Sequence, residues 1–381
     1  MNMKKDIFCN LPFTEIFLGP NQDIKTCCSA HESLGNLGES TIETILQSKK
    51  AKKIRQQFLN NEWPNQCLQC KQQEEQGARS ERNNNKEELL KSTTTFDENT
   101  FLLRKLDLRW SNTCNLSCVY CYEYFSSKWS EIKQIKINTL NTENEESLFA
   151  FIAKNVEQHP LTEGLLLLGG EPLLQKQNLR LIELLQGNGF YILSNLSVPL
   201  ENNKIAQKLL AEKSTHWGIS FETVGPKFEY VRRGASWITF NQNIDYLHKH
   251  KKDSSRIEAH SLYSIYSAFN LTEFYEFILD KQFNEVYWNL LESSGNSVNV
   301  NVLNLSYKMR QKAIKEIEKC EKEFPFAPGI KSLTSIKNSM IANLDQSTDI
   351  DQQVYNDIKD IESKLKNTSL VFENLWPNLF V

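Results

Sequence analysis

Short apolar runs alternate with amphipathic stretches through the middle of the chain. Strand-like runs are expected at residues 101–110, 164–168, 190–193, 217–221, 257–261 and 285–290. Apolar positions recur at helical spacing in the segments between them, at residues 143–158, 178–185, 238–248 and 271–279. This alternation predicts parallel strands joined by helical crossovers, because each amphipathic helix must cover one face of the sheet.

The carboxyl-terminal part has a helical pattern only. From about Leu305 onward, Ala313, Ile317, Cys320 and Phe324 share one helical face, so we expect Cys320 to be a buried core thiol. A second helix is expected over residues 350–365, and the tail at 371–380 is apolar enough to pack on the body of the protein.

The amino-terminal part is rich in cysteine. Residues 1–90 contain five cysteines around a helix-like stretch that starts at residues 41–48, and the polar residues 77–99 have the composition of a linker. The predicted fold class is therefore α/β: a partial (β/α)6 TIM-like barrel at residues 96–300, with a small Cys-rich domain and linker at 1–95 and a helical extension at 301–381.

Composition narrows the function. The chain has 381 residues, 40% hydrophobic and 24% charged, which suits a globular protein with a sizeable core. The net charge of -3 argues against a nucleic-acid binder, and we expect the short basic run at 48–55 to be a solvated helix face. No apolar run reaches the roughly 20 residues of a membrane span, and no secretory apolar segment follows Met1, so a cytoplasmic location without membrane binding is expected. In that reducing compartment, cysteines are more plausible as metal ligands than as disulfides.

Three cysteines lie close together just after the first predicted barrel strand: Cys114, Cys118 and Cys121. Thiolates are soft ligands that select iron–sulfur clusters, zinc or copper. A closed zinc site needs four ligands, yet no other Cys or His lies near this run in the sequence. A four-iron cluster held by three thiolates would leave one iron open to bind a small molecule.

This spacing, Cys-x3-Cys-x-aromatic-Cys, is followed by Gly169-Gly170-Glu171-Pro172 at the end of the second barrel strand. Together the two motifs resemble the radical S-adenosylmethionine superfamily. The resemblance implies that Cys114, Cys118 and Cys121 hold the catalytic 4Fe-4S cluster, whose open iron chelates S-adenosylmethionine. It also implies that the four residues from Gly169 to Pro172 bind the methionyl amino group, and that Tyr120 lies near adenine.

Weaker parts of the resemblance follow downstream. Ser220 and Arg233 lie in segments that look like the family's fourth strand and Arg-Gly segment, which implies contacts with ribose and carboxylate. A surface arginine is the alternative for Arg233. Glu222 stands where the family usually has Asp, and Asn195 lies where many members have Thr-Asn-Gly, so its role as a cofactor contact rests on position alone.

The amino-terminal cysteines carry a second resemblance, to the half-size "twitch" form of the SPASM auxiliary domain, over most of residues 7–75. It implies that Cys9, Cys27, Cys67 and Cys70 hold an auxiliary 4Fe-4S cluster, with Cys28 as a spare. Two departures are that Gln22 replaces the expected hairpin glycine and that the domain precedes the barrel. A zinc ribbon is the alternative, because four thiolates with a Cys-x2-Cys pair fit tetrahedral zinc equally well.

The resemblance implies a radical reaction. Reduced flavodoxin or ferredoxin would supply an electron, S-adenosylmethionine would be cleaved reductively, and the resulting 5′-deoxyadenosyl radical would abstract hydrogen from substrate. A peptide or protein side chain is the leading substrate, since many enzymes with such auxiliary domains are maturases. The alternatives are a sugar or aminocyclitol dehydrogenase, which the helical carboxyl-terminal part favours, and a non-catalytic iron–sulfur electron carrier or sensor, against which the retained motif at Gly169–Pro172 counts.

Overall fold

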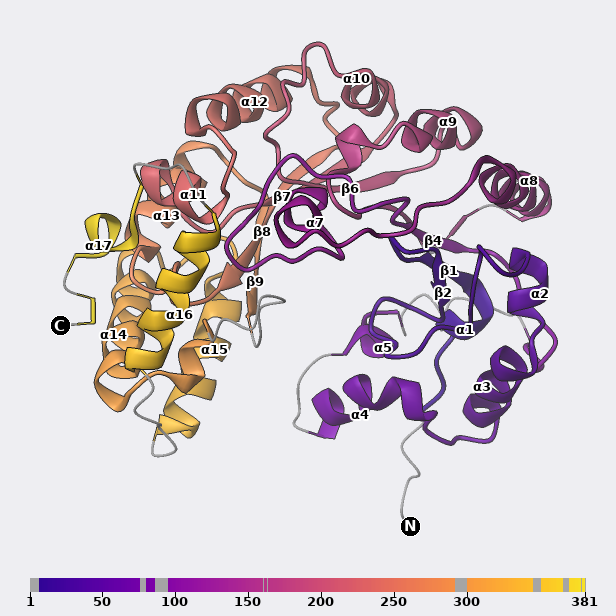
Figure 1. The fold of residues 1–381 in the computed structure, drawn as a ribbon, viewed down its shortest axis with the longest axis horizontal. Helices are drawn as coiled ribbons and strands as arrows, with labels where there is room; N and C mark the ends of the chain where they lie inside the picture. Colours follow the sequence, from indigo (N-terminus) through magenta and orange to yellow (C-terminus); the bar gives the residue numbers. More distant parts are fainter. Residues whose placement is uncertain are drawn as a thin grey trace. The chain divides into compact units, whose positions relative to one another are not determined.

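A computed structural model describes residues 7–75, 80–85, 95–159, 161–162, 164–291, 300–344, 351–365, 370–377 and 379–380. The chain divides into two compact units, the first with residues 1–112 and 137–191 and the second with residues 113–136 and 192–381 (Figure 1). The predicted fold class is confirmed: the fold is mixed α/β, with parallel strands consistent with a partial TIM barrel, a Cys-rich amino-terminal region and carboxyl-terminal helices. The division at residues 95 and 300 stays a prediction.

The first unit contains a sheet with the strand order β3-β2-β1-β4-β5. Its strands are β1 (Glu15–Leu18), β2 (Asp23–Lys25), β3 (Gly35–Asn36), β4 (Lys105–Leu108) and β5 (Gly164–Leu167). β1 is antiparallel to β2 and parallel to β4, in a register that sets Glu15 opposite Lys105. The strand predicted at 101–110 is therefore shorter than expected, and the sequence analysis missed β1, β2 and β3.

Helices surround this sheet in the first unit. The long crossover helix α8 (Thr142–Gln158) buries Phe149, which stacks on Trp110 with ring centroids 5.2 Å apart. The shorter helices of the unit are α1 (Leu11–Thr14), α2 (Ile42–Leu46), α3 (Lys49–Leu59), η1 (Asn65–Cys67), α4 (Leu68–Glu75), α5 (Glu81–Asn84), η2 (Pro172–Leu174) and α9 (Gln177–Leu184). Most of the linker predicted at 77–99 lies outside the described residues.

The basic run at 48–55 is only partly a solvated helix face. Lys49, Lys50 and Lys53 are exposed on α3, but Arg55 is fully buried. Its Nε donates to the Glu98 carbonyl at 2.8 Å, and its Nη2 donates to the Leu46 carbonyl at 2.7 Å. The expectation is wrong for Arg55 because backbone carbonyls replace the water that a buried guanidinium would lose.

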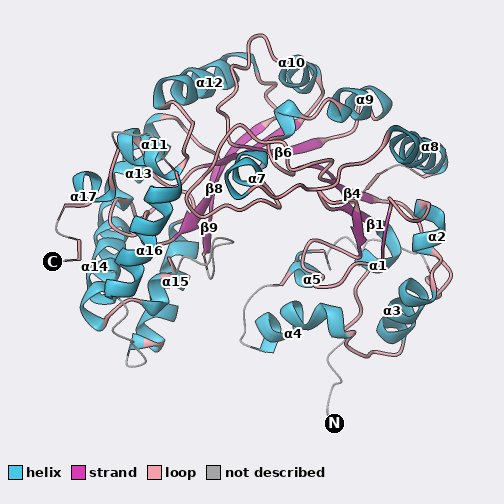
Figure 2. Ribbon diagram, viewed as in Figure 1, coloured by secondary structure: helices cyan, strands magenta, loops and turns pink. Residues whose placement is uncertain are grey.

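The second unit contains most of β6 (Phe190–Ser194) and all of β7 (Thr215–Ser220), β8 (Arg256–Tyr263) and β9 (Glu285–Leu290), in that order. β7 is parallel to β8 and β8 to β9, so that Ser220 lies opposite His260 and His260 opposite Tyr287. Phe221 packs on Phe240 of α12 (Trp237–His250) and on Phe274 of α13 (Leu271–Asp280). These two helices thus cover one face of the strands (Figure 2).

Helices complete the second unit. The predicted carboxyl-terminal helices are α14 (Tyr307–Glu323), in which Cys320 is a fully buried core thiol as expected, and α16 (Asp351–Lys364). In the tail, Phe372 of α17 (Phe372–Leu375) stacks on Trp376, and both are buried. The sequence analysis missed α7 (Ser127–Lys133), α10 (Lys204–Ala211), α11 (Gly225–Val231) and η3 (Val302–Asn304), and it gave no bounds for α15 (Ile330–Ala342) within the extension expected to be helical. No helix in the described residues combines the length and apolar character needed to cross a membrane.

Candidate iron–sulfur sites

The three-cysteine loop lies in the second unit and is fixed through its backbone. The Ser117 amide donates to the Arg233 carbonyl at 2.9 Å, and the Val119 amide donates to the Val231 carbonyl at 3.0 Å. The indole Nε1 of Trp129, a fully buried residue of α7, donates to the Cys118 carbonyl at 2.9 Å. An irregular loop thus keeps one conformation because other segments satisfy its polar groups.

The side chains of the loop differ in exposure. Cys118 is buried, whereas Cys114 and Cys121 are half-buried. A turn closed by the Cys121 amide and the Cys118 carbonyl, 3.0 Å apart, joins the last two cysteines. Asn195 lies beside the first, with its Nδ2 3.7 Å from the Cys114 sulfur. Burial raises the pKa of the Cys118 thiol and raises that of Cys121 to about 12, and a bound metal would lower both by stabilising the thiolates.

A buried ion pair lies next to Cys118. Nη2 of Arg232 is 2.7 Å from Oε2 of Glu222, and the Tyr120 hydroxyl donates to Oε1 of the same carboxylate at 3.0 Å. The Arg232 guanidinium lies 5.5 Å from the centre of the Tyr120 ring, and its positive charge opposes the rise in the Cys118 pKa that burial causes. The sequence analysis assigned no role to Arg232. The only indication of one in the sequence was its position next to Arg233.

Arg233 is buried, so its alternative interpretation as a surface arginine is wrong. Its guanidinium lies 4.8 Å from the centre of the Tyr230 ring, and its Nε and Nη1 have no hydrogen-bond partner among the described residues. A buried donor without a partner is costly, so this guanidinium suits an anionic ligand such as a carboxylate. Ser220, the other residue of this part of the motif, is half-buried at the end of β7.

The Gly-Gly-Glu-Pro turn belongs to the first unit. Gly169 has φ +121°, and a Cβ there would lie 2.7 Å from Nε2 of Gln175 and 3.3 Å from the Ser111 carbonyl, so only glycine fits. The Gly170 amide donates to the Ser111 carbonyl at 3.4 Å. Glu171 is fully buried and accepts a hydrogen bond from the Leu173 amide at 3.1 Å.

Pro172, the last residue of the Gly-Gly-Glu-Pro turn, begins η2. The Pro172 carbonyl accepts a hydrogen bond from Nδ2 of Asn178 at 2.9 Å, and Oδ1 of Asn178 accepts one from the Trp110 indole at 2.8 Å. All three side chains are buried, so the turn has a fixed shape before any ligand binds.

The amino-terminal cysteines come from separate segments of the first unit. Cys9 precedes α1, Cys27 follows β2, Cys67 ends η1 and Cys70 lies in α4. Cys9 and Cys27 belong to one buried cluster against which Cys67 packs. The charges of Cys67 and Cys70 also act on the Cys9 thiol. Cys28 is exposed instead, with its sulfur 3.9 Å from the Ser29 hydroxyl.

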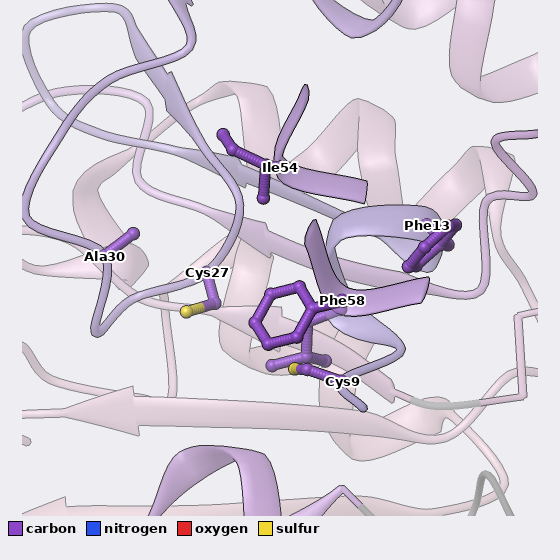
Figure 3. Packing of buried hydrophobic residues seen from close by; sticks show 7 residues of the cluster. Cys9, Phe13, Cys27, Ala30, Ile54 and Phe58 are labelled. Carbon is purple, nitrogen blue, oxygen red and sulfur yellow. The ribbon is translucent and has the colours of Figure 1, made fainter. Parts of the chain in front are cut away.

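This group of thiols has an apolar wall. Cys9 and Cys27 pack in one buried cluster with Phe13, Ile54 and Phe58 (Figure 3). Burial raises the pKa of the Cys9 and Cys27 thiols, and it raises that of Cys67 to about 12. In the part of the chain that the structure describes, no three His, Cys, Asp or Glu side chains are arranged to hold a single metal ion.

A buried acid lies near the same thiols. Glu15 is 2% exposed, its carboxylate is 3.6 Å from the Lys105 ammonium, and its charge acts on Cys27. Loss of water raises the Glu15 pKa to about 8, although the positive charge of Lys105 opposes that rise.

Gln22 occupies the position where the hairpin glycine was expected. It has φ +74°, so the backbone keeps the left-handed conformation that glycine would supply. Its side chain is buried, and Nε2 donates to the Thr139 carbonyl at 2.9 Å. The departure from the motif therefore changes the residue but not the shape of the hairpin.

Two family models match the chain. The model described as the radical SAM superfamily matches residues 108–263, and the SPASM model, described as an iron–sulfur cluster-binding domain, matches residues 9–71. No curated protein matches.

The chain is also similar to solved structures. Streptococcus suis SuiB bound to S-adenosylmethionine is 13% identical with a TM-score of 0.43, and the match covers 74% of this chain and 60% of that one. SuiB bound to the precursor peptide SuiA is 13% identical, with a TM-score of 0.42 and coverage of 68% and 59%. Native anSMEcpe with bound AdoMet and Cp18Cys peptide is 16% identical, with a TM-score of 0.39 and coverage of 56% and 58%. The chain spans 58–60% of the length of these three structures, and 48% of that of SuiB in a further crystal structure.

Proposed function

We infer that this chain, which belongs to the radical S-adenosylmethionine superfamily and carries a SPASM iron–sulfur cluster-binding domain, abstracts a hydrogen atom from a peptide or protein side chain. When bound, the 4Fe-4S cluster supplies the electron, taken from reduced flavodoxin or ferredoxin, that cleaves S-adenosylmethionine to methionine and a 5′-deoxyadenosyl radical. The observation that carries the proposal is the three-cysteine loop, within the stretch that matches the superfamily.

In this proposal Cys114, Cys118 and Cys121 are the cluster ligands. The unpartnered donors of buried Arg233 suit the carboxylate of S-adenosylmethionine, and the half-buried Ser220 hydroxyl suits a ribose hydroxyl. Asn195, beside the Cys114 sulfur, would orient that ligand or the bound cofactor.

The remaining cofactor contacts differ in how they are fixed. Gly169 and Gly170 let the backbone approach a ligand, and Glu171 supplies a carboxylate for the methionyl ammonium. Pro172 fixes the turn, since it begins η2. Tyr120 would lie near adenine, with its ring held through the hydroxyl by Glu222.

Cys9, Cys27, Cys67 and Cys70 are the proposed ligands of the auxiliary cluster. Support comes from their mutual electrostatic interactions and from the SPASM match over residues 9–71. Cys28 is left out because it is exposed and points to Ser29.

A small-molecule substrate such as a sugar or aminocyclitol is the second candidate. It is favoured by the helical carboxyl-terminal extension, whose described residues from 300 onward form helices and offer no strand to a leader peptide.

The test of the proposed reaction is anaerobic. We expect reconstituted protein to hold about eight irons per chain, two 4Fe-4S clusters, and to form 5′-deoxyadenosine from S-adenosylmethionine and dithionite. Absence of 5′-deoxyadenosine from protein with a full iron content contradicts the enzyme proposal. Four irons with one zinc contradicts the auxiliary cluster alone.

The substrate is tested by isotope transfer. A peptide encoded beside the gene, deuterated at its side chains, should pass deuterium into 5′-deoxyadenosine and leave the reaction with an altered mass. A panel of deuterated sugars and aminocyclitols is the matched comparison. Deuterium transfer from that panel and not from the peptide contradicts the maturase proposal and supports the second candidate.

A further inference from the structure

Arg232 is a buried cation that no part of the proposed reaction uses. It follows α11 directly and precedes Arg233, and it is 6% exposed. Its guanidinium pairs with Glu222 and lies 5.5 Å from the centre of the Tyr120 ring. Its backbone lies opposite Cys118, because the Ser117 and Val119 amides donate to the Arg233 and Val231 carbonyls, and its charge acts on the Cys118 thiol. Arg232 thus places a buried cation beside one proposed cluster ligand.

The ion pair by itself does not account for this arrangement. A buried pair recovers its desolvation cost only with good geometry and further hydrogen bonds, so it is weak evidence of added stability. Nε of Arg232 has no hydrogen-bond partner among the described residues, so the pairing with Glu222 leaves part of the guanidinium unsatisfied. A sulfur that carries negative charge would satisfy such a donor better than a neutral thiol does.

Glu222 is placed to orient the guanidinium. One of its carboxylate oxygens takes the Arg232 Nη2 at 2.7 Å and the other takes the Tyr120 hydroxyl at 3.0 Å. The family's usual Asp is one methylene shorter than this side chain. The extra length is used here to reach two donors from the end of β7.

We propose that Arg232 raises the reduction potential of the cluster held by Cys114, Cys118 and Cys121, by holding a permanent positive charge against the Cys118 sulfur. This inference rests on the proposed function, since it presupposes that the three thiolates hold a cluster. Reduction moves one electron from the donor, flavodoxin, ferredoxin or dithionite, to the cluster and adds one negative charge there. A guanidinium stays charged at all relevant pH, so it stabilises the reduced form more than the oxidised form. Hydrogen bonds to the sulfurs and net charge are known determinants of cluster potential.

The test is a redox titration of the full reconstituted chain, followed by electron paramagnetic resonance. Adding S-adenosylmethionine identifies the barrel cluster, because only its signal changes when the open iron is ligated. Arg232→Gln should lower the midpoint potential of the cluster. We expect the ratio of reduced to oxidised cluster at a given applied potential to fall about tenfold, which corresponds to a midpoint shift of about 59 mV for one electron. Arg232→Lys keeps the charge and should move the potential much less.

Arg256→Gln is the matched control. Arg256 also pairs with a glutamate, Glu258, at 3.2 Å, but its side chain is 47% exposed and it lies on β8. We expect this variant to leave the potential unchanged. A shift as large as that of Arg232→Gln would contradict the proposal, as would an unchanged potential in Arg232→Gln with its iron content intact.

Arg232→Gln leaves Glu222 buried without its partner and is at risk of misfolding. Glu222→Gln is the second variant, because it keeps the Arg232 charge and removes the opposing one. Its midpoint potential should rise, and a potential equal to that of the wild type contradicts the proposal. The two inferences fail separately: wild-type protein that makes no 5′-deoxyadenosine contradicts the proposed function, whereas unchanged potentials in a chain that makes it contradict only the role of Arg232.

Discussion

The two cysteine sites of this chain are built in opposite ways. The barrel site takes Cys114, Cys118 and Cys121 from one loop, whereas the amino-terminal site takes its cysteines from four separate segments of the first unit. The loop is held by hydrogen bonds from its backbone, and the second site is enclosed by packed aromatic rings. A local ligand set survives small changes in packing, and a dispersed one depends on the whole fold around it.

The ionisable groups beside the two sites are of opposite kinds. Arg232, a cation, acts on Cys118 in the second unit, and Glu15, an acid, acts on Cys27 in the first. The cation favours added negative charge on its cluster, whereas the Glu15 carboxyl, whose pKa burial raises to about 8, opposes it only where it is ionised, above about pH 8. We therefore expect Arg232 to make the barrel cluster easier to reduce, and we expect no comparable effect of Glu15 on the auxiliary cluster at pH 7.

The largest expected effect separates the two ligand sets. Cys118→Ala removes one of three ligands from the reactive cluster, so formation of 5′-deoxyadenosine should be abolished. Cys70→Ala should lower the iron content by about four per chain, one 4Fe-4S cluster, and leave cleavage of S-adenosylmethionine measurable. Quantified iron and 5′-deoxyadenosine check both. Equal loss of cleavage in the two variants would show that the sites are not independent.

The dispersed site should be sensitive to packing. Phe58 is 2% exposed and packs in the cluster that contains Cys9 and Cys27, so Phe58→Ala should cost about 3–5 kcal/mol of unfolding free energy in the first unit. Urea unfolding measures that loss, and the auxiliary iron should fall with it. Leu59→Ala is the matched control from the same helix, because Leu59 is exposed. Unchanged auxiliary iron in Phe58→Ala would contradict the dependence of this site on its apolar wall.

The dependence of stability on pH tests the packing around His260 in the second unit. Loss of water lowers the His260 pKa from 6.5 to about 4, because burial disfavours the imidazolium. As the pH falls below 6.5, the unfolded chain binds a proton that the folded chain does not bind until about pH 4. Stability is therefore full above pH 6.5 and is lost toward pH 4, with a slope of at most about 1.4 kcal/mol per pH unit. His260→Gln should flatten the dependence of urea midpoint on pH over this range, and an equally steep dependence in the variant would contradict it.

Sequence reasoning succeeded where the signal is local. β9 was predicted with both ends correct, and the alternation of strands and helices predicted the partial barrel. Both predictions rest on the spacing of apolar residues and the length of each apolar run, which can be seen within a few neighbouring residues. The strands β1, β2 and β3 were missed because they have four, three and two residues. Such short runs become strands only through pairing, here of β1 with β4, which no local pattern encodes.

The sites follow the same rule. The cysteine loop was found because its three thiols are close in sequence, and Arg233 was found through a motif. Arg232 could not be assigned, since its partner Glu222 lies beyond a strand end and its position opposite Cys118 arises only in the fold. Cys27 and Cys28 are neighbours in sequence, so only their opposite exposure separates them.

The smallest expected effect compares two glutamines with left-handed backbone. Gln22 in the first unit has φ +74° and Gln282 in the second has φ +51°. A non-glycine residue in this conformation destabilises the folded protein by roughly 1–2 kcal/mol, and glycine removes that strain. Glycine also destabilises the folded protein by about 0.5–1 kcal/mol, because it increases the conformational entropy of the unfolded chain. Gln22→Gly also loses the hydrogen bond to the Thr139 carbonyl, so its stability should change by less than about 1 kcal/mol.

Gln282→Gly should be the more favourable change, because Gln282 is exposed and its side chain makes no hydrogen bond within the described residues. Relief of the left-handed strain is then larger than the added entropy cost, and we expect a gain of about 0.5 kcal/mol. Urea midpoints of the two variants against wild type give the comparison. If Gln22→Gly proved as stabilising as Gln282→Gly, the buried hydrogen bond of Gln22 would contribute nothing, and the glycine expected from the SPASM motif would be the better residue at the hairpin.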